Sequence, residues 1–502
     1  MDKFTPLHNG GTLSLDNWPV LDFESFQEEI VRRYEEGQRV SALYALPENE
    51  STRHEFVAVM TDDHNGTLYL GHAILDGREF QSITKQCPPV HLFEREIFEQ
   101  HGITPVGHPW LKPVRFQKSL ETETGEMALP KIGITDYFRV EGESVHEVAV
   151  GPVHAGIIEP GHFRFQCHGE EVFHLEISLG YQHRGIERAL IGSPNYRTLH
   201  YMETAAGDTT VGHTTAYCEV LESLSKGKPS LRSQVIRAIA LELERIANHI
   251  GDLGALAGDV GFLPTASYCG RIRGDFLNMS ALICGSRFGR GIVIPGGIGF
   301  DMEPGRVEKL SQMLQQGYAD ITNAVELLWN STSVLARFEG TGAVTAKVAR
   351  ELGIVGPAAR ACSLTQDVRL DHPTGHYRFS HIPISSCRTG DVFARAYVRW
   401  LEVQHSIEYI QEQLMALPSG PVKTAIQSLS PDSVCVSLVE GWRGEICHVA
   451  QTNAAGQFKR YKIVDPSFHN WSGLAMALRN QQISDFPLCN KSFNLSYCGY
   501  DL

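Results

Sequence analysis

Side chains that could bind a ligand or relay a proton gather between Ala206 and His213, in the run AGDTTVGH. A carboxylate at Asp208, hydroxyls at Thr209 and Thr210 and the imidazole of His213 stand there among small residues. Glycine lets another backbone or a ligand approach closely, because it carries no side chain. Two interpretations follow: a ligand pocket built from these polar groups, or a close-packed segment from which a former site has been removed.

Further histidines and glutamates are candidates for the same chemistry. They are His154, His162 and His183, together with Glu159, Glu187, Glu242 and Glu244. Histidine titrates near neutral pH and a buried carboxyl can keep its proton there, so either type can serve in a proton relay. The alternative for each is a structural side chain that is hydrogen-bonded or paired with a cation.

Composition and charge limit the class of protein. Of the 502 residues, 42% are hydrophobic and 20% are charged, which is ordinary for a folded globular chain. The formal net charge is −14 and no lysine- or arginine-rich run occurs, so we expect no nucleic-acid partner. No run of about 18 apolar residues exists, and the start MDKFTPLHNG lacks the apolar core of a signal peptide. We therefore expect a cytosolic chain that meets a membrane only through partners.

Motifs for metals and nucleotides are missing from the sequence. No two of the 11 cysteines are separated by just two residues, which argues against zinc-ribbon and iron-sulfur spacings. Glycine clusters such as GDLGALAGDVG do not follow a strand and open a helix, as a dinucleotide site requires. We expect no metal, and no cofactor bound by this chain itself.

The elements that must position these residues divide the chain into two parts. Residues 22–36 carry apolar residues at three- and four-residue spacing, which predicts an amphipathic helix. Strand-like runs follow at 39–46, 56–62 and 66–75. Residues 1–116 are therefore predicted to form a small α+β domain, and the polar, aperiodic stretch at 117–138 is interpreted as a linker.

The second part, residues 139–502, is predicted to be mainly helical. The run HFRFQCHGEEVFHLEIS at 162–178 alternates apolar and polar residues on both sides of a turn, which is typical of a β-hairpin. Apolar seams predict long helices at 233–253, 306–330 and 391–417, and such helices pack best against one another. The predicted fold class is α+β, a small N-terminal α+β domain followed by a large, mainly helical-bundle domain with peripheral β-hairpins.

One motif in the first part carries a family resemblance. PPVHLFEREIFEQHGITPVGHP, from Pro88 to Pro109, resembles the signature of the small peripheral-arm subunit of respiratory complex I. The matching residues are Glu94, Arg95, Glu96, Gly102, Ile103, Gly107, His108 and Pro109. The family usually has an acidic or amide residue next, where this chain has Trp110. Without the resemblance, the same run is a charged helix that ends at Gly102.

The second part resembles the large subunit shared by complex I and the membrane-bound, energy-converting nickel-iron hydrogenases. The matching runs are GPVHAGIIEPGHFRF, LGYQHRGIE, ELERIANHI, GAVTAKVARELGIVGPAARAC, DVRLDHP, GDVFARAYVR, GWRGEICH and DPSFHNW, in this order. Their fusion behind the first domain resembles the large subunits of formate hydrogenlyase type. The resemblance implies a hydrogenase large-subunit-like fold for residues 139–502.

The same resemblance implies that a metal site has been lost. The nickel-binding cysteines of the hydrogenases align with Ala206, Thr209, Ser496 and Gly499, and Cys498 is one residue out of register. None of these four side chains can replace a thiolate ligand. The tyrosine that meets quinone in complex I aligns with Gly207. We therefore interpret Ala206, Gly207, Thr209, Ser496 and Gly499 as a vacated pocket and Glu159, His162, His183, Asp208, His213 and Glu244 as candidate relay or pocket residues.

The resemblance also implies partners and a place in the cell. We expect a structural and coupling subunit next to an iron-sulfur subunit whose clusters are not in this chain, with antiporter-like and complex I-like membrane subunits beyond. The chain would lie peripherally on the cytoplasmic side of the inner membrane. A quinone or other electron-acceptor site is the alternative, and an active nickel-iron hydrogenase a third possibility. The link to NADH dehydrogenases suggests an assembly that uses NAD, although the chain has no NAD motif.

Overall fold

A computed structural model describes residues 3–47, 53–117, 131–156 and 158–502. The N-terminal unit is an antiparallel sheet in the order β1-β5-β4-β3. Its strands are β1 (Thr5–Leu7), β3 (Arg39–Pro47), β4 (Arg53–Asp62) and β5 (Thr67–Asp76), and its helices are α1 (Phe23–Glu35) and α2 (His91–His101). Helix α1 begins where the Asp22 carboxylate accepts a hydrogen bond from Ser25 N at 2.8 Å. The predicted helix and the three predicted strands are confirmed.

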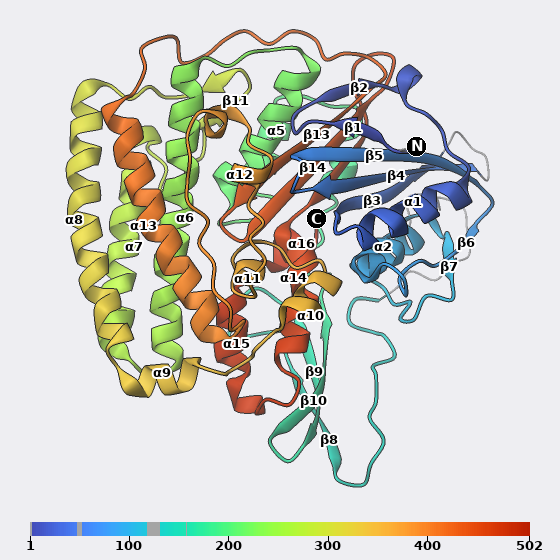
Figure 1. Cartoon of the computed structure of the whole chain (residues 1–502), viewed down its shortest axis with the longest axis horizontal. Coiled ribbons are helices and arrows are strands. Elements are labelled where there is room, and N and C mark those ends of the chain that lie inside the picture. Colours follow the sequence, from blue (N-terminus) through green and yellow to red (C-terminus); the bar gives the residue numbers. More distant parts are fainter. Residues whose placement is uncertain (1–2, 48–52, 118–130, 157) are drawn as a thin grey trace.

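Long helices form the opposite side of the molecule in Figure 1. They are α6 (Leu231–Asp259), α7 (Leu263–Cys284), α8 (Pro304–Trp329) and α13 (Val392–Met415). All three long helices predicted from apolar seams are present. Together with the N-terminal unit they confirm the predicted fold class. No helix in the described part of the chain is long and apolar enough to cross a bilayer.

A second four-stranded sheet lies between the bundle and the N-terminal unit (Figure 1), and the sequence analysis did not predict it. Its order is β15-β14-β13-β2, with β2 (Thr12–Ser14), β13 (Ser433–Gly441), β14 (Gly444–Thr452) and β15 (Phe458–Val464). Every residue of β13 and β14 is buried. Helix α5 (Thr210–Leu224) packs on these two strands. This central sheet is therefore part of the core.

The predicted hairpin is confirmed as β9 (His162–His168) paired with β10 (Glu171–Ser178), and β8 (Val145–Val150) joins β9 on its other side. This sheet projects away from the body in Figure 1.

The chain ends in α14 (Pro466–Ala477), α15 (Phe486–Phe493) and α16 (Tyr497–Tyr500). The short elements are β6 (Glu79–Gln81), β7 (Thr104–Val106), α3 (Ile186–Ala189), α4 (Thr198–Glu203), β11 (Val293–Ile294), β12 (Gly297–Ile298), α9 (Thr332–Phe338), α10 (Ala346–Glu351), α11 (Gly356–Arg360) and α12 (Val368–Asp371).

The boundaries of the two parts stay a prediction. Residues 118–130 of the linker at 117–138 lie outside the described residues. Strand β2, from the first part, pairs with β13 through Leu13 and Val434, so the two parts share a sheet.

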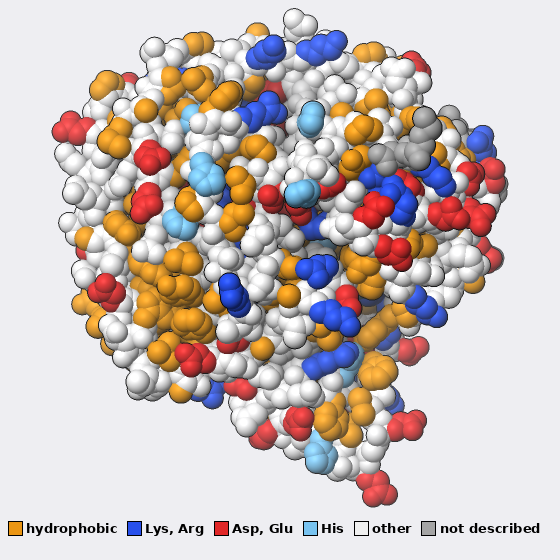
Figure 2. Space-filling model, in the orientation of Figure 1, with side chains coloured by type: hydrophobic (Ala, Val, Ile, Leu, Met, Phe, Trp, Pro, Cys, Tyr) orange, Lys and Arg blue, Asp and Glu red, His pale blue; other side chains and the backbone are white. Residues whose placement is uncertain are grey.

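On the face in Figure 2, acidic and basic side chains are interspersed and no broad basic area is visible.

Candidate functional site

The start of α5 and the C-terminal tail meet in the core, as the resemblance implies. Arg443, in the turn between β13 and β14, holds both segments. Its Nη1 and Nη2 atoms donate to the two carboxylate oxygens of Asp208 at 2.6 and 2.7 Å, and its Nε donates to the backbone oxygen of Asn494. The backbone of Gly207 also reaches the sulfur of Cys498. A bidentate contact of this kind fixes both the distance between the guanidinium and the carboxylate and their relative orientation.

A chain of hydrogen bonds between buried side chains occupies the centre of this region. His213 Nε2 lies 3.0 Å from Asp465 Oδ2, and His213 Nδ1 lies 3.1 Å from His448 Nε2. The other ring nitrogen of His448 lies 2.8 Å from the hydroxyl of Tyr461. All four side chains are fully or almost fully buried. We call Tyr461, His448, His213 and Asp465 the buried centre.

The electrostatics of the buried centre favour one arrangement of protons. Burial tends to raise the pKa of Asp465, but the hydrogen bond and charge of His213 outweigh it, so the pKa is lowered and the group is a carboxylate acceptor. Burial, and to a lesser degree His213, hold the pKa of His448 well below its ordinary value. Burial raises the pKa of the Tyr461 hydroxyl. The distances fit a chain in which Tyr461 donates to His448, His448 donates to His213 and His213 donates to Asp465, so that each member has a partner.

The residues present do not fit a nickel-iron centre. A Cβ atom added at Gly499 would lie 2.7 to 2.9 Å from the carboxylate of Asp465, so Asp465 occupies the space that a cysteine would need. Ser496 Oγ instead accepts the backbone N–H of Gly499 at 2.9 Å, and Thr209 Oγ1 donates to Asp208 at 3.2 Å. In the described part of the chain, no cluster of three His, Cys, Asp or Glu side chains is placed to hold a metal ion.

Glu244 lies at the outer edge of this region, on α6. Its carboxylate accepts the backbone N–H groups of Val211 at 2.7 Å and Gly212 at 3.1 Å, at the start of α5. Burial raises its pKa to about 8, against the lowering effect of these two hydrogen bonds. Glu244 and Arg273 are among the residues that line a small cavity of about 20 Å³, which has room for one water molecule. Glu244 can therefore hold a proton at neutral pH.

The other predicted residues lie apart from the buried centre. Glu159 accepts the backbone N–H of Tyr497 at 3.3 Å, so it contacts the tail. His162 and His183 contact the backbone oxygens of Gly151 and Asp501 at 3.3 and 3.0 Å, which matches the structural interpretation. His154 contacts the backbone oxygen of Gly161, while Glu187 and Glu242 are paired with buried lysine or arginine side chains.

The sequence analysis named no individual role for Arg443, His448, Tyr461 or Asp465, although they build the centre. Three of them stand in runs that carry the resemblance: Arg443 and His448 in GWRGEICH and Asp465 in DPSFHNW. These runs were the available signal. Tyr461 lies outside these runs, and no sequence signal pointed to it.

Buried ion pairs join the N-terminal unit to the central sheet. Glu96 of α2 contacts Lys462 Nζ at 2.7 Å and also pairs with Arg115. Lys462 in turn lies 3.0 Å from Glu187, which pairs with Arg460 at 3.2 Å. Removing one partner from such a set would leave an uncompensated buried charge, so these contacts fix the relative position of the two units.

Comparison with known proteins finds a matching protein family for each of the two parts of the chain. Residues 25–123 match the family described as "Respiratory-chain NADH dehydrogenase, 30 Kd subunit", and residues 259–434 match "Respiratory-chain NADH dehydrogenase, 49 Kd subunit". Formate hydrogenlyase subunit 5 of Escherichia coli K12 is 27% identical over 92% of this chain and 85% of its own length. The carbon monoxide-induced hydrogenase of Rhodospirillum rubrum is 29% identical over 70% of this chain and 98% of its own. An NADH-quinone oxidoreductase subunit of Solibacter usitatus is 27% identical over 63% of this chain and 86% of its own.

Proposed function

The chain belongs to the superfamily of complex I peripheral-arm and hydrogenase subunits, with the 30 Kd and 49 Kd units fused, and from this premise we propose that it is a non-nickel, hydrogenase-like subunit of a membrane-associated redox complex. Its role is structural and coupling. It packs beside an iron-sulfur subunit and transmits redox or conformational change to ion-translocating membrane subunits.

One observation carries the loss of nickel in this proposal. The position of the expected fourth cysteine, Gly499, is in close contact with the carboxylate of Asp465. That carboxylate is already held by His213 and by the backbone N–H of Ser467 at 2.8 Å. The protein's own side chains therefore take the place of metal and thiolates, and the centre serves to hold α5, the central sheet and the tail together.

A partner surface next to the tail supports the second half of the proposal. Val153 and Ile158, in the loop before β9, are 76% and 42% exposed. Ile132, Ile134 and Phe138 are large exposed apolar residues in the segment that precedes β8. Exposed apolar side chains in such number on one stretch of chain indicate a surface that a partner covers. Glu159, in the same loop as Val153, contacts the tail, so a partner there would sense the position of the tail.

An open groove favours the alternative, an electron-acceptor site. The groove has a volume of about 380 Å³ and is lined by residues of the same loop, including Val153, His154 and Glu159. A quinone headgroup needs an apolar wall with a few polar groups, which this groove offers. Binding of a quinone analogue to the assembled complex, lost on His154→Ala, would favour this alternative.

The test uses the affinity-purified complex from its native host. We expect less than about 0.1 nickel per chain by mass spectrometry and no infrared bands of diatomic iron ligands. Stoichiometric nickel would contradict the proposal.

A matched pair of variants tests the structural role of the buried centre. Tyr461→Phe removes the hydroxyl at its end, and Tyr217→Phe removes a hydroxyl that bonds Thr198 at 2.6 Å instead. We expect both assembled complexes to keep electron transfer and ion translocation within about twofold of wild type. An assembled, folded Tyr461→Phe complex that is inactive, beside an active Tyr217→Phe complex, would show instead that the centre relays protons.

A further inference from the structure

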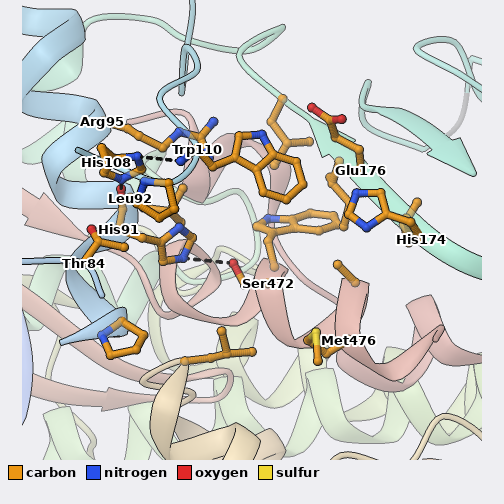
Figure 3. A pocket seen from close by; sticks show the side chains of 18 of the residues that line it. Thr84, His91, Leu92, Arg95, His108, Trp110, His174, Glu176, Ser472 and Met476 are labelled. Carbon is orange, nitrogen blue, oxygen red and sulfur yellow. Dashed lines mark hydrogen bonds between the residues drawn. The ribbon is translucent and has the colours of Figure 1, made fainter. Parts of the chain in front are cut away.

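A cavity lies away from the buried centre, where the N-terminal unit meets α14 and β10. Its volume is about 470 Å³, within the range of small-molecule sites. Figure 3 shows Arg95, His91 and His108 on one side, Glu176 and His174 on the other, and Trp110 between them. Three separate parts of the chain thus build its walls.

Arg95 brings a positive charge to this cavity without a balancing carboxylate. Its Nε and Nη2 atoms each donate at 2.8 Å, to the backbone oxygens of Lys112 and Pro113. These bonds fix the guanidinium, but carbonyl oxygens do not neutralise it. Among the described residues, no carboxylate lies within 4 Å of it and Nη1 has no acceptor. Because arginine stays protonated in proteins, the charge is permanent and part of its donor fork is unused.

The neighbouring ionisable groups form no salt bridge with this guanidinium, although the carboxylates of Glu99 and Glu176 act on it from a longer distance. His108 Nδ1 accepts the backbone N–H of Trp110 at 3.0 Å, so Nε2 carries the proton that it donates to the backbone oxygen of His91. Burial lowers the pKa of His108 to about 4 and that of His91 to about 3, so both rings are neutral. The carboxylate of Glu176 is engaged by Lys112 at 2.7 Å and by the backbone N–H of Phe138 at 2.7 Å.

The remaining walls are mainly aromatic and apolar, with Lys85 and Arg479 as further basic residues. The ring of Trp110 stacks on His174, with centroids 5.4 Å apart. Leu92, Leu352 and Met476 also line the cavity. Trp471 and His174 are 3% and 8% exposed, and in the described structure Trp471 Nε1 and His174 Nε2 have no hydrogen-bond partner. Buried polar atoms of this kind are normally satisfied by protein, water or a ligand.

We propose that this cavity binds a small organic anion with an aromatic body, whose acidic group pairs with Arg95. The acidic group takes the free end of the guanidinium fork. The body lies against Trp110 and the apolar residues of α14, with the Trp471 N–H available to an acceptor on the ligand. This site is distinct from the buried centre and from the groove before β9, and it does not depend on the proposed function.

Two fluorescent probes with the same body and different charge test the proposal on the full chain. 8-Anilinonaphthalene-1-sulfonate carries the anionic group, and N-phenyl-1-naphthylamine is the same body without it. We expect one saturable site for the sulfonate. Arg95→Gln should weaken sulfonate binding about tenfold or more, because a charge-assisted contact is lost, and change binding of the neutral probe less than about twofold.

Two further variants serve as controls: one fills the cavity, and the other removes a positive charge from the protein surface. Ala475→Phe, on the α14 wall, should weaken both probes because it fills the space. Arg139→Gln removes an arginine whose side chain is 82% exposed, and it should change neither probe. Circular dichroism confirms that each variant is folded.

Three outcomes would overturn the proposal: no saturable sulfonate binding, sulfonate binding that Ala475→Phe leaves unchanged, or equal effects of Arg95→Gln on both probes. A crystal structure of the sulfonate-bound wild-type chain decides the matter if Arg95→Gln does not fold. The sulfonate is expected within hydrogen-bonding distance of Arg95 Nη1, and a sulfonate bound elsewhere would contradict the assignment.

Discussion

Helix α14 borders two polar regions that differ in how their charges are satisfied. At its start, the carboxylate of Asp465 has His213 and the backbone N–H of Ser467 as partners, and Gly499 packs closely against it. Further along, Ser472 and Met476 face a cavity of about 470 Å³ in which Arg95 lacks a counter-ion. Along one helix, the place where the resemblance puts a metal site is packed protein interior, while a neighbouring space has stayed open.

The difference teaches how a filled site and a usable site can be told apart. In the buried centre, each donor has a protein acceptor, so a ligand could enter only by breaking existing bonds. At the Arg95 cavity, the guanidinium has no carboxylate within 4 Å and Trp471 Nε1 has no hydrogen-bond partner among the described residues, and leaving buried polar groups unpaired costs about 1–3 kcal/mol each. Substitutions in the buried centre should therefore destabilise the fold more than equivalent substitutions at the cavity.

The largest effect is expected from a pair of histidines. His448→Ala should lower the free energy of unfolding by about 3–5 kcal/mol, because it opens a void and leaves the Tyr461 hydroxyl and His213 Nδ1 without partners. His91→Ala removes only a 3.2 Å contact with Ser472 at the cavity wall and should cost about 1 kcal/mol. Urea unfolding of both variants measures the difference. Equal losses would contradict the distinction between the two regions.

The parts of the fold that the sequence predicted are those with one buried face. Helix α1 buries Phe26 and Ile30 and exposes Glu28 and Glu35, so its spacing is readable. Strands β13 and β14 are buried on both faces and yet carry Glu440, Glu445 and other charged residues. Such strands have no apolar alternation, and the sequence analysis missed them.

The partners of those buried charges come from distant parts of the chain. Arg39, in β3, pairs with Glu445 at 2.8 Å across 406 residues of sequence. No local pattern contains that information. The candidate site divides in the same way: the resemblance suggested Ala206, Thr209, Ser496 and Gly499 as a vacated pocket, which stays a prediction, but the bonds among His213, His448 and Asp465 depend on tertiary packing.

Glu244 should make stability depend on pH. Its pKa is raised to about 8 in the folded state, mainly by burial, against 4.5 for an unperturbed glutamate. Between these values the folded state binds more protons than the unfolded state, so stability should fall as the pH rises from about 4.5 to 8. Glu244→Gln removes this titration.

The comparison of Glu244→Gln with wild type sharpens this prediction. Relative to its difference from wild type at pH 5, the variant should gain about 4 kcal/mol at pH 8.5, measured by urea unfolding across the range. Glu326→Gln, on the exposed face of α8, should leave the curve unchanged. A variant with the same pH dependence as wild type would show that Glu244 is ionised throughout.

Two of the glycines that we interpret as part of a vacated pocket should differ in how well they tolerate a methyl group. A Cβ atom at Gly499 meets the Asp465 carboxylate at 2.7 to 2.9 Å, whereas one at Gly207 meets nothing within 4 Å. Gly499→Ala should therefore cost about 1–3 kcal/mol and Gly207→Ala less than about 0.5 kcal/mol. Thermal unfolding is sufficient to separate them. A tolerated Gly499→Ala would mean that Asp465 can move aside and that the pocket is less filled than its contacts indicate.

The smallest effect compares two serines on α14 itself. Ser467 Oγ accepts the backbone N–H of Ser496 at 2.9 Å in the buried centre, and Ser472 Oγ contacts His91 at 3.2 Å beside the cavity. Ser467→Ala leaves a buried N–H unpaired and should cost about 1–2 kcal/mol, while water in the cavity can replace the hydroxyl lost in Ser472→Ala, at a cost below about 0.5 kcal/mol. Both substitutions remove one hydroxyl from the same helix, so differences in helix propensity cancel. Hydrogen exchange at the Ser496 amide should accelerate in Ser467→Ala alone, and acceleration in both variants would mean that α14 transmits the change and that the two regions are not independent.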